Sequence, residues 1–392
     1  MPRDPSSPAP SAPPPRLSRL AVALAAAAAL ALAATGLGVL GADHEVPGAA
    51  NGVGAGDRSL RGAPDIIDVH VHVSPKGLPR LRELMRVHGI RAIVNLSGGD
   101  PLSGLAAQLA AAARAPKELI VFTTLAYEQA GFADYGARMA QLVRLAHARG
   151  ARGLKIAKVL GLGLRTGQGT RIPVDDPGLD PVFEAAGELG MPVAIHTGDP
   201  EAFWLPVDER NPRRAELEVH PSWALYGRDV PSFDELLGEL ERRIARHPHT
   251  TFISVHFGNA AERPEYVARM LRKYPNLFID TAARIPELGR HPAQEMRAFF
   301  IEFQDRILYG SDLGVGPAPS PLFLGSSGAA PPRNEDVLRF FDASRRYFES
   351  GDRQFDHPTP IQGDWKIDGI ALPPEVLAKI YHGNAERVLR LR

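Results

Sequence analysis

The chain contains no cysteine among its 392 residues. Disulfides, thiolate metal sites and a cysteine nucleophile are therefore excluded, and any metal must be held by histidine and carboxylate side chains. Lysine is scarce as well, since only 7 of the 45 basic residues are lysine. The 45 basic residues balance 45 acidic ones, and this neutral charge provides no field that would gather nucleic acid.

The first 42 residues have the features of an export signal. Residues 1–19 are rich in Pro and Ser and carry three arginines and one acid, and residues 20–42 are uncharged and mostly Ala and Leu. This order is typical of a signal peptide, and the apolar stretch is also long enough to span a bilayer. We therefore expect residues 1–42 to be a signal peptide or a membrane anchor, followed by a linker at 43–64. The rest of the chain is expected to be exported, as a periplasmic or extracellular protein or one anchored to the cytoplasmic membrane by residues 20–42.

From residue 65 onward, short Val/Ile-rich runs alternate with longer helical patterns. The expected strands are 65–71, 90–96, 118–124, 152–157, 191–196, 250–256, 276–280 and 306–311. Helical periodicity fills 79–88, 101–114, 135–149, 179–189, 233–246, 262–273 and 286–304. This alternation predicts an α/β fold with a parallel sheet, and eight strands are the number that closes a (β/α)₈ TIM barrel. An open doubly wound sheet is the alternative, but the Gly-rich phosphate turn that usually follows its first strand is missing.

Two segments are longer than a simple strand–helix connection requires. Residues 199–231 are rich in Pro, Trp and charge, and residues 313–334 are rich in Pro and Gly. Both follow the carboxyl end of an expected strand, which is where barrel enzymes build their active sites. We therefore expect these two segments to shape the mouth of a barrel that spans 65–392.

The first strand, "IIDVHVHVSP", carries two histidines inside an apolar run. Side chains alternate along a strand, so His70 and His72 share one face with Asp68. Burying an imidazole is unfavourable in free energy unless its ring nitrogens form hydrogen bonds or bind another group. A single metal ion can bind both histidines.

Four other strand ends carry polar residues that suit the same purpose. They are Lys155, His196, His256 and Asp312. Each one alone is also explained as an ordinary hydrogen-bonded residue, turn residue or ion-pair partner. In a barrel, however, these ends converge on one mouth, and nitrogen and oxygen donors together suit Zn²⁺, Fe²⁺ or Mn²⁺.

The motifs "DVHVHV", "GLKIAK", "VAIHTGDP", "SVHFGN", "YGSD" and "HGNAERVL" resemble those of the amidohydrolase superfamily. The similarity runs from about residue 65 to 392 and is closest to the branch that holds small-acid decarboxylases and lactone hydrolases. It implies a distorted (β/α)₈ barrel that binds a divalent metal, most readily one Zn²⁺, with two as the alternative. The implied metal ligands are His70, His72, His196 and Asp312, and the implied catalytic residues are Asp312 and His256. Lys155 matches the position of a metal-bridging carboxylated lysine in binuclear members, whereas in mononuclear members this position need not be a ligand.

The expected reaction is hydrolysis of a lactone, ester or amide by water that the metal activates. Non-oxidative decarboxylation of a small carboxylic acid is the alternative, and a non-catalytic, membrane-tethered binding protein on the same scaffold is a third. Arg284, just after the seventh strand, is a candidate clamp for a substrate carboxylate or else a member of a surface ion pair.

Overall fold

The computed structural model describes residues 65–391, so the expected export segment and most of the linker lie outside the described residues. The sheet strands are β1 (Ile66–Val73), β2 (Ile90–Asn95), β3 (Leu119–Thr124), β4 (Gly153–Ile156), β5 (Val193–Ile195), β6 (Phe252–Ser254), β7 (Leu277–Asp280), β8 (Ile307–Leu308), β9 (Leu313–Val315) and β10 (Phe323–Leu324). A separate hairpin pairs β11 (Phe355–Asp356) with β12 (Lys366–Ile367).

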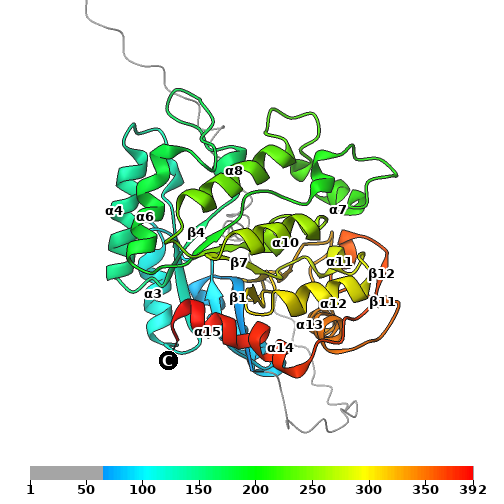
Figure 1. The fold of residues 1–392 in the computed structure, drawn as a ribbon. Coiled ribbons are helices and arrows are strands. Elements are labelled where there is room, and N and C mark those ends of the chain that lie inside the picture. Colours follow the sequence, from blue (N-terminus) through cyan, green and yellow to red (C-terminus); the bar gives the residue numbers. More distant parts are fainter. Residues whose placement is uncertain (1–64, 392) are drawn as a thin grey trace, which may run out of the picture. The chain divides into compact units, whose positions relative to one another are not determined.

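Helices alternate with the strands along the chain and pack around the outside of the sheet (Figure 1). The longer ones are α2 (Leu78–His88), α3 (Leu105–Ala113), α4 (Tyr135–Ala148), α6 (Asp180–Glu188), α8 (Phe233–Arg246), α10 (Pro264–Lys273), α12 (Ala293–Glu302) and α13 (Asn334–Glu349). The short ones are α5 (Val159–Leu162), α7 (Arg214–Val219), α9 (Val255–Gly258), α11 (Ile285–Leu288), α14 (Pro374–Ala378) and α15 (Asn384–Leu389). No helix within residues 65–391 is long and apolar enough to cross a membrane.

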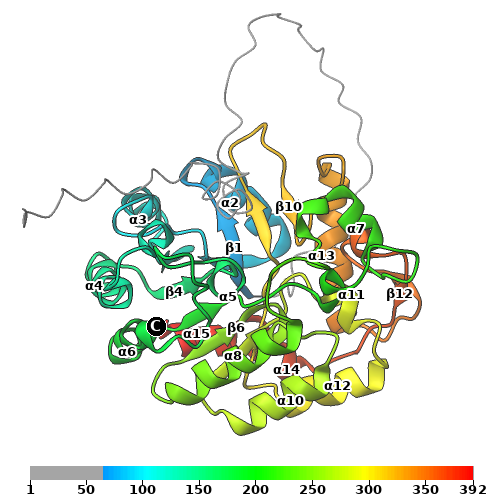
Figure 2. The ribbon, with the colours of Figure 1, turned by 90° about the horizontal axis from the view of Figure 1, so that it is seen from above.

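The strands form one curled sheet in the order β10-β9-β1-β2-β3-β4-β5-β6-β7-β8, parallel except for β10. The two ends of the run β1 to β8 meet, because Val69 N–H donates to the Tyr309 carbonyl and Asp312 N–H donates to the His70 carbonyl, both at 2.9 Å. Viewed from above, helices α3, α4, α6, α8 and α10 lie outside the strands (Figure 2). This mixed α/β architecture is consistent with a TIM-like barrel, as the alternation in the sequence predicts.

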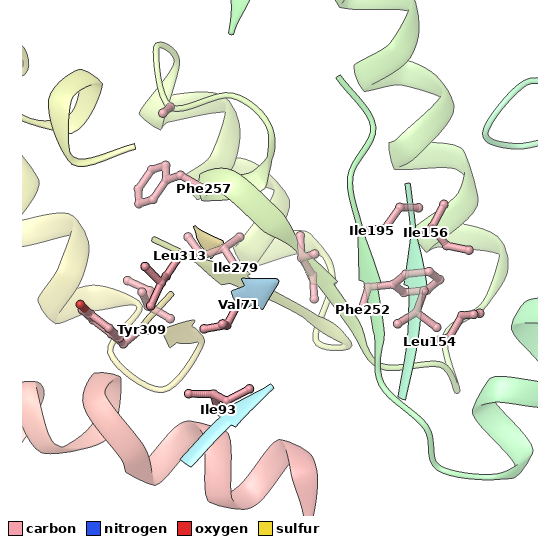
Figure 3. Close-up of a cluster of buried hydrophobic side chains, with 14 of the residues drawn as sticks. Val71, Ile93, Leu154, Ile156, Ile195, Phe252, Phe257, Ile279, Tyr309 and Leu313 are labelled. Atoms are coloured by element: carbon pink, nitrogen blue, oxygen red, sulfur yellow. The ribbon is translucent and has the colours of Figure 1, made fainter. Parts of the chain in front are cut away.

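Two apolar layers follow from the alternation of side chains along the strands. Leu154 and Ile156 of β4 face the helices with Ile195 of β5 and Phe252 of β6 (Figure 3). The other face forms an inner cluster of mainly aliphatic residues, with one aromatic ring: Ile67, Val69, Ala92, Val94, Ile120, Phe122, Ala194, Ile253 and Leu308. Ala385 and Leu389 of α15 complete that inner cluster, so the closing helix covers the end where the strands begin.

The structure differs from the sequence expectation in several elements, among them the short strands β9 and β10 that extend the sheet. The helix expected at 286–304 is divided into α11 and α12, and Pro292, which has no N–H to donate, stands immediately before α12. Helix α13 and the β11–β12 hairpin were not expected. All eight expected barrel strands are present, most of them shorter than expected.

Candidate active site

Asp312 and the two histidines of β1 meet at the carboxyl end of the strands. The backbone of Asp312 is in the left-handed region, with φ of 63°, and this places its carboxylate over β1. Its Oδ1 lies 3.3 Å from Nε2 of His70 and 3.3 Å from Nε2 of His72. The three residues thus converge as the sequence predicts.

The hydrogen bonds on the far side of each imidazole fit a metal in this position. His70 Nδ1 lies 2.9 Å from Asp280 Oδ2, and His72 Nδ1 lies 2.6 Å from Ser97 Oγ. When both Nδ1 atoms donate, both Nε2 atoms present lone pairs to the Asp312 oxygen, and converging acceptors require a cation or proton between them. Two ligand atoms at a tetrahedral angle on one Zn²⁺ are about 3.4 Å apart, near the observed spacing.

His256 stands beside this pair on a strained piece of backbone. Its φ is 54°, and its N–H donates to Asp280 Oδ1 at 2.8 Å. Its Nδ1 lies 2.9 Å from the Ala282 carbonyl, which accepts a hydrogen bond and leaves Nε2 with a lone pair. The ring centroid is 4.7 Å from that of His70 and 4.4 Å from that of His196. A side chain in this tautomer can hold a metal or accept a proton, but it cannot donate from Nε2.

The ligand atoms of His70, His256 and Asp312 all lie within 4.8 Å of one another. His196, at the end of β5, is half-buried beside them, and its Nε2 lies 2.7 Å from the Gly198 carbonyl. Burial lowers the pKa of His196 and His256 well below the usual value, and the positive charge of Arg284 acts in the same direction. Both imidazoles are therefore neutral near pH 7, the form in which a histidine binds a metal.

Lys155 points into the barrel from β4, opposite in parity to Leu154 and Ile156. Its ammonium group is buried, and Nζ has no hydrogen-bond partner among the described residues. Burial lowers its pKa to about 8, while the charges of Asp280 and Asp312 oppose that shift. An ion pair with a nearby carboxylate was one of two expected solutions for this lysine, and none lies within 4.0 Å in the described part of the chain.

Arg284 is buried next to the site, with 6% of its surface exposed. Its Nη1 donates to the carbonyl of Ala283, its own neighbour, at 3.0 Å. The interpretation of Arg284 as a member of a surface pair is therefore wrong, whereas its assignment as a carboxylate clamp stays a prediction.

Two further acids support the site from below. Asp280, at the end of β7, contacts His70 and His256 as described above, and Asp68 accepts hydrogen bonds from the N–H groups of Ser311 (3.0 Å) and His70 (3.1 Å). Burial raises the pKa of Asp68 to about 7. Asp280 was not among the residues predicted for the site, although it ends the strand "LFID" and the same strand-end rule would have identified it.

The family is decided by the match along the chain. The model of the amidohydrolase family matches residues 67–391. The chain belongs to this family. The resemblance to this family that the sequence motifs indicated is thus confirmed. No curated protein matches the sequence of this amidohydrolase.

Several solved structures are similar to this chain at low sequence identity, with TM-scores below 0.5. A 2,6-dihydroxybenzoate decarboxylase from Rhizobium has 18% identity and a TM-score of 0.49, covering 83% of this chain and 98% of its own. A 4-oxalomesaconate hydratase from Rhodopseudomonas palustris has 17% identity and a TM-score of 0.45, covering 83% and 95%. A probable 2-pyrone-4,6-dicarboxylic acid hydrolase from Acinetobacter baumannii has 14% identity and a TM-score of 0.45, covering 84% and 100%.

Proposed function

We propose that this amidohydrolase is a metal-dependent hydrolase that cleaves a C–O or C–N bond in a lactone, ester or amide of a small carboxylated substrate. The observation that carries the proposal is the convergence of His70, His256 and Asp312 within 4.8 Å, with the cationic side chains of Lys155 and Arg284 buried nearby. Nitrogen and carboxylate donors without thiolate suit Zn²⁺, Fe²⁺ or Mn²⁺, and we propose one Zn²⁺ per chain.

The residues that would hold the metal are His70, His72, His196 and Asp312. When bound, the metal supplies Lewis-acid chemistry and lowers the pKa of water at the site. Asp280 fixes the tautomer of His70 through Nδ1, so that Nε2 is free to act as a ligand.

Asp312 is proposed as the general base. Burial acts to raise its pKa, but the interactions with His70 and His72 and the charge of Lys155 outweigh burial and hold the pKa below its usual value. The carboxylate is therefore ionised near neutral pH. It can accept a proton from the attacking water and return that proton to the leaving group.

His256 and the two cations are proposed to position the reactants. The Nε2 lone pair of His256 can accept a hydrogen bond from the attacking water, because Nδ1 is engaged by the Ala282 carbonyl. The Lys155 ammonium can stabilise negative charge that develops on the substrate. Arg284 can bind the substrate carboxylate through its guanidinium.

The test is to measure metal content by mass spectrometry and to screen the metal-loaded protein against lactones, esters, amides and small carboxylic acids. Hydrolysis that a chelator abolishes and zinc restores would support the proposal. Release of carbon dioxide without consumption of water would instead establish a decarboxylase. A fully metal-loaded protein that binds carboxylates but turns over none would point to the non-catalytic, membrane-tethered binding protein.

We also propose that the enzyme is exported. This rests on the basic and apolar segments of residues 1–42 in the sequence, which lie outside the described residues. Its substrate would then be a small molecule met beyond the cytoplasmic membrane, with residues 20–42 cleaved or retained as an anchor.

A further inference from the structure

Arg284 is a buried guanidinium that lacks an acidic partner among the described residues. It occupies the N-cap position of α11, its charge acts on His196 and His256, and its side chain donates a hydrogen bond to the Ala283 carbonyl. No carboxylate of residues 65–391 forms an ion pair with it within 4.0 Å. Buried charges are ordinarily paired, so this arrangement requires an explanation.

An acid that could pair with Arg284 is present but already engaged. Glu287 lies three residues further along, the spacing at which side chains on a helical turn meet. Its Oε1 instead contacts Nη1 of Arg213, while its Oε2 is buried without a hydrogen-bond partner. Arg213 comes from the long segment after β5, 74 positions earlier in the chain.

Arg213 also holds a second acid. Its Nε donates to Glu216 Oε2 at 2.7 Å, and its Nη2 lies 2.6 Å from the same oxygen. Glu216 Oε1 accepts from Ser326 Oγ, in the segment after β10. Arg213, Glu216 and Glu287 are each no more than 2% exposed, so the two long segments that the sequence marked are joined by one buried cluster.

We propose that Arg213 is a positioning residue: by holding both Glu216 and Glu287, it leaves Arg284 without an internal acid and keeps that guanidinium available for a substrate carboxylate. This inference rests on the proposed function, since it concerns how the same site selects carboxylated ligands. The planar fork of arginine suits this task, because it can reach two carboxylates at once.

The decisive experiment measures binding of phthalate, a small dicarboxylate, and of phthalide, a neutral lactone, by calorimetry on the metal-loaded full chain. In Arg213→Met, Glu287 is free to capture Arg284, and phthalate affinity should fall by about tenfold or more, the value of a charged hydrogen bond. Phthalide binding should change by less than about twofold, since it lacks the charge that Arg284 recognises. Adding Glu287→Gln to Arg213→Met should restore phthalate binding to within about threefold of wild type, because an amide holds a guanidinium far less strongly.

A second variant guards against loss of folding. Arg213→Lys keeps the charge but cannot span both acids, so a weaker fall in phthalate affinity is expected, again reversed by Glu287→Gln. Arg243→Lys is the matched control, because Arg243 is also fully buried and pairs with Asp180, not with Glu216 or Glu287. It should alter stability and leave phthalate binding unchanged.

Several outcomes would overturn the inference. The first is a folded Arg213 variant that binds phthalate as tightly as the wild-type protein does. The second is a loss of phthalate affinity that Glu287→Gln does not reverse. The third is a wild-type protein that does not bind phthalate. The readout is independent of turnover. If the protein shows the expected phthalate binding in all variants but hydrolyses no substrate, the proposed hydrolase activity is wrong and the role of Arg213 stands. If the protein hydrolyses lactones but its variants do not show the expected phthalate binding, only the role of Arg213 is wrong.

Discussion

Asp280 joins the side chain of His70, in the first strand, to the backbone that follows the sixth and seventh strands. Its Oδ2 lies 2.9 Å from His70 Nδ1, and its Oδ1 accepts from the N–H groups of His256 at 2.8 Å and Ala282 at 3.1 Å. One fully buried carboxylate thereby orients the imidazole of His70 and holds the backbone that carries His256.

Asp280→Asn is expected to weaken metal binding by about 10–100-fold, the usual cost of losing a partner behind a ligand. The amide keeps an oxygen for the two backbone donors but presents an N–H₂ group to His70 Nδ1. His70 would then carry its proton on Nε2, where the metal should bind. Competition for zinc with a chromophoric chelator measures the change.

Asp134→Asn is the control for Asp280→Asn, because Asp134 is an exposed acid that pairs with Arg138 on the surface. It should bind zinc as wild type does. Equal zinc affinity in Asp280→Asn and wild type would show that Asp280 does not orient His70.

The positions of the strand-end residues could be predicted from sequence because parallel strands place their carboxyl ends at one edge. The Val/Ile-rich runs located all eight strands. The alternation of side chains along the fourth strand placed Lys155 on the face opposite to Leu154 and Ile156, which is the inside of the barrel. Helix α13 was overlooked although Val337, Phe340, Phe341 and Phe348 recur at helical spacing. The Pro/Gly-rich segment that separates it from β8 obscured its place as the eighth helix.

The supporting contacts could not be predicted in the same way. Arg213 and Glu287 are 74 positions apart, and His70 and Asp280 are 210 apart. Such pairs depend on how the loops between strands and helices fold. The spacing of apolar residues in the sequence predicts helices and strands, but it does not specify the path of an irregular loop.

Asp312→Asn should lower kcat/KM by about 10²–10⁴-fold, because general base catalysis contributes that much. The substitution keeps the shape of the side chain and removes its basicity. Steady-state kinetics on a substrate from the screen provide the measurement, with Asp305→Asn, an exposed acid beside Lys379, as control. Retention of more than about a tenth of kcat/KM would remove Asp312 from this role.

Export is testable without a substrate. Fractionation of cells that produce the full chain should place it beyond the cytoplasmic membrane, cleaved or membrane-bound, because residues 1–42 combine a basic and an apolar segment. Deletion of residues 20–42 should retain the protein in the cytoplasm. Recovery of the full-length chain as a cytoplasmic protein with Met1 intact would contradict the expectation.

His357 should contribute to acid sensitivity. Burial lowers its pKa to about 4, below the usual value of about 6.5 for the unfolded chain. Between these values the unfolded state binds a proton that the folded state does not, so the free energy of unfolding falls as pH decreases. His357→Gln removes this contribution. The stability advantage of wild type over the variant should shrink by about 2 kcal/mol between about pH 7 and about pH 5.

Urea unfolding of both chains in the presence of a chelator measures this difference without a contribution from metal release. The N–H of Thr359 donates to His357 Nδ1 and the Gly363 carbonyl lies 3.0 Å from Nε2, which explains why the neutral ring is held. A difference in unfolding free energy that stays constant across this pH range would mean that His357 titrates alike in both states.

Lys155 determines how many metals the site is expected to hold. A buried amine without a partner could react with carbon dioxide to give a carbamate that bridges two metals, or it could remain an ammonium beside one metal. The charges of Asp280 and Asp312 act on Lys155 to favour the ammonium, and its pKa of about 8 leaves it mostly protonated at neutral pH. We therefore expect one metal per chain and an unmodified lysine.

Metal stoichiometry and carbon NMR after equilibration with ¹³C-bicarbonate distinguish these two states of Lys155. One metal per chain, no carbamate signal, and one metal retained in Lys155→Met support the mononuclear site. Lys158→Met is the control, because Lys158 is the next lysine along the chain and pairs with Asp199 at 2.7 Å. Two metals in wild type, a carbamate resonance, and loss of metal in Lys155→Met alone would establish a binuclear hydrolase in which Lys155 bridges the metals.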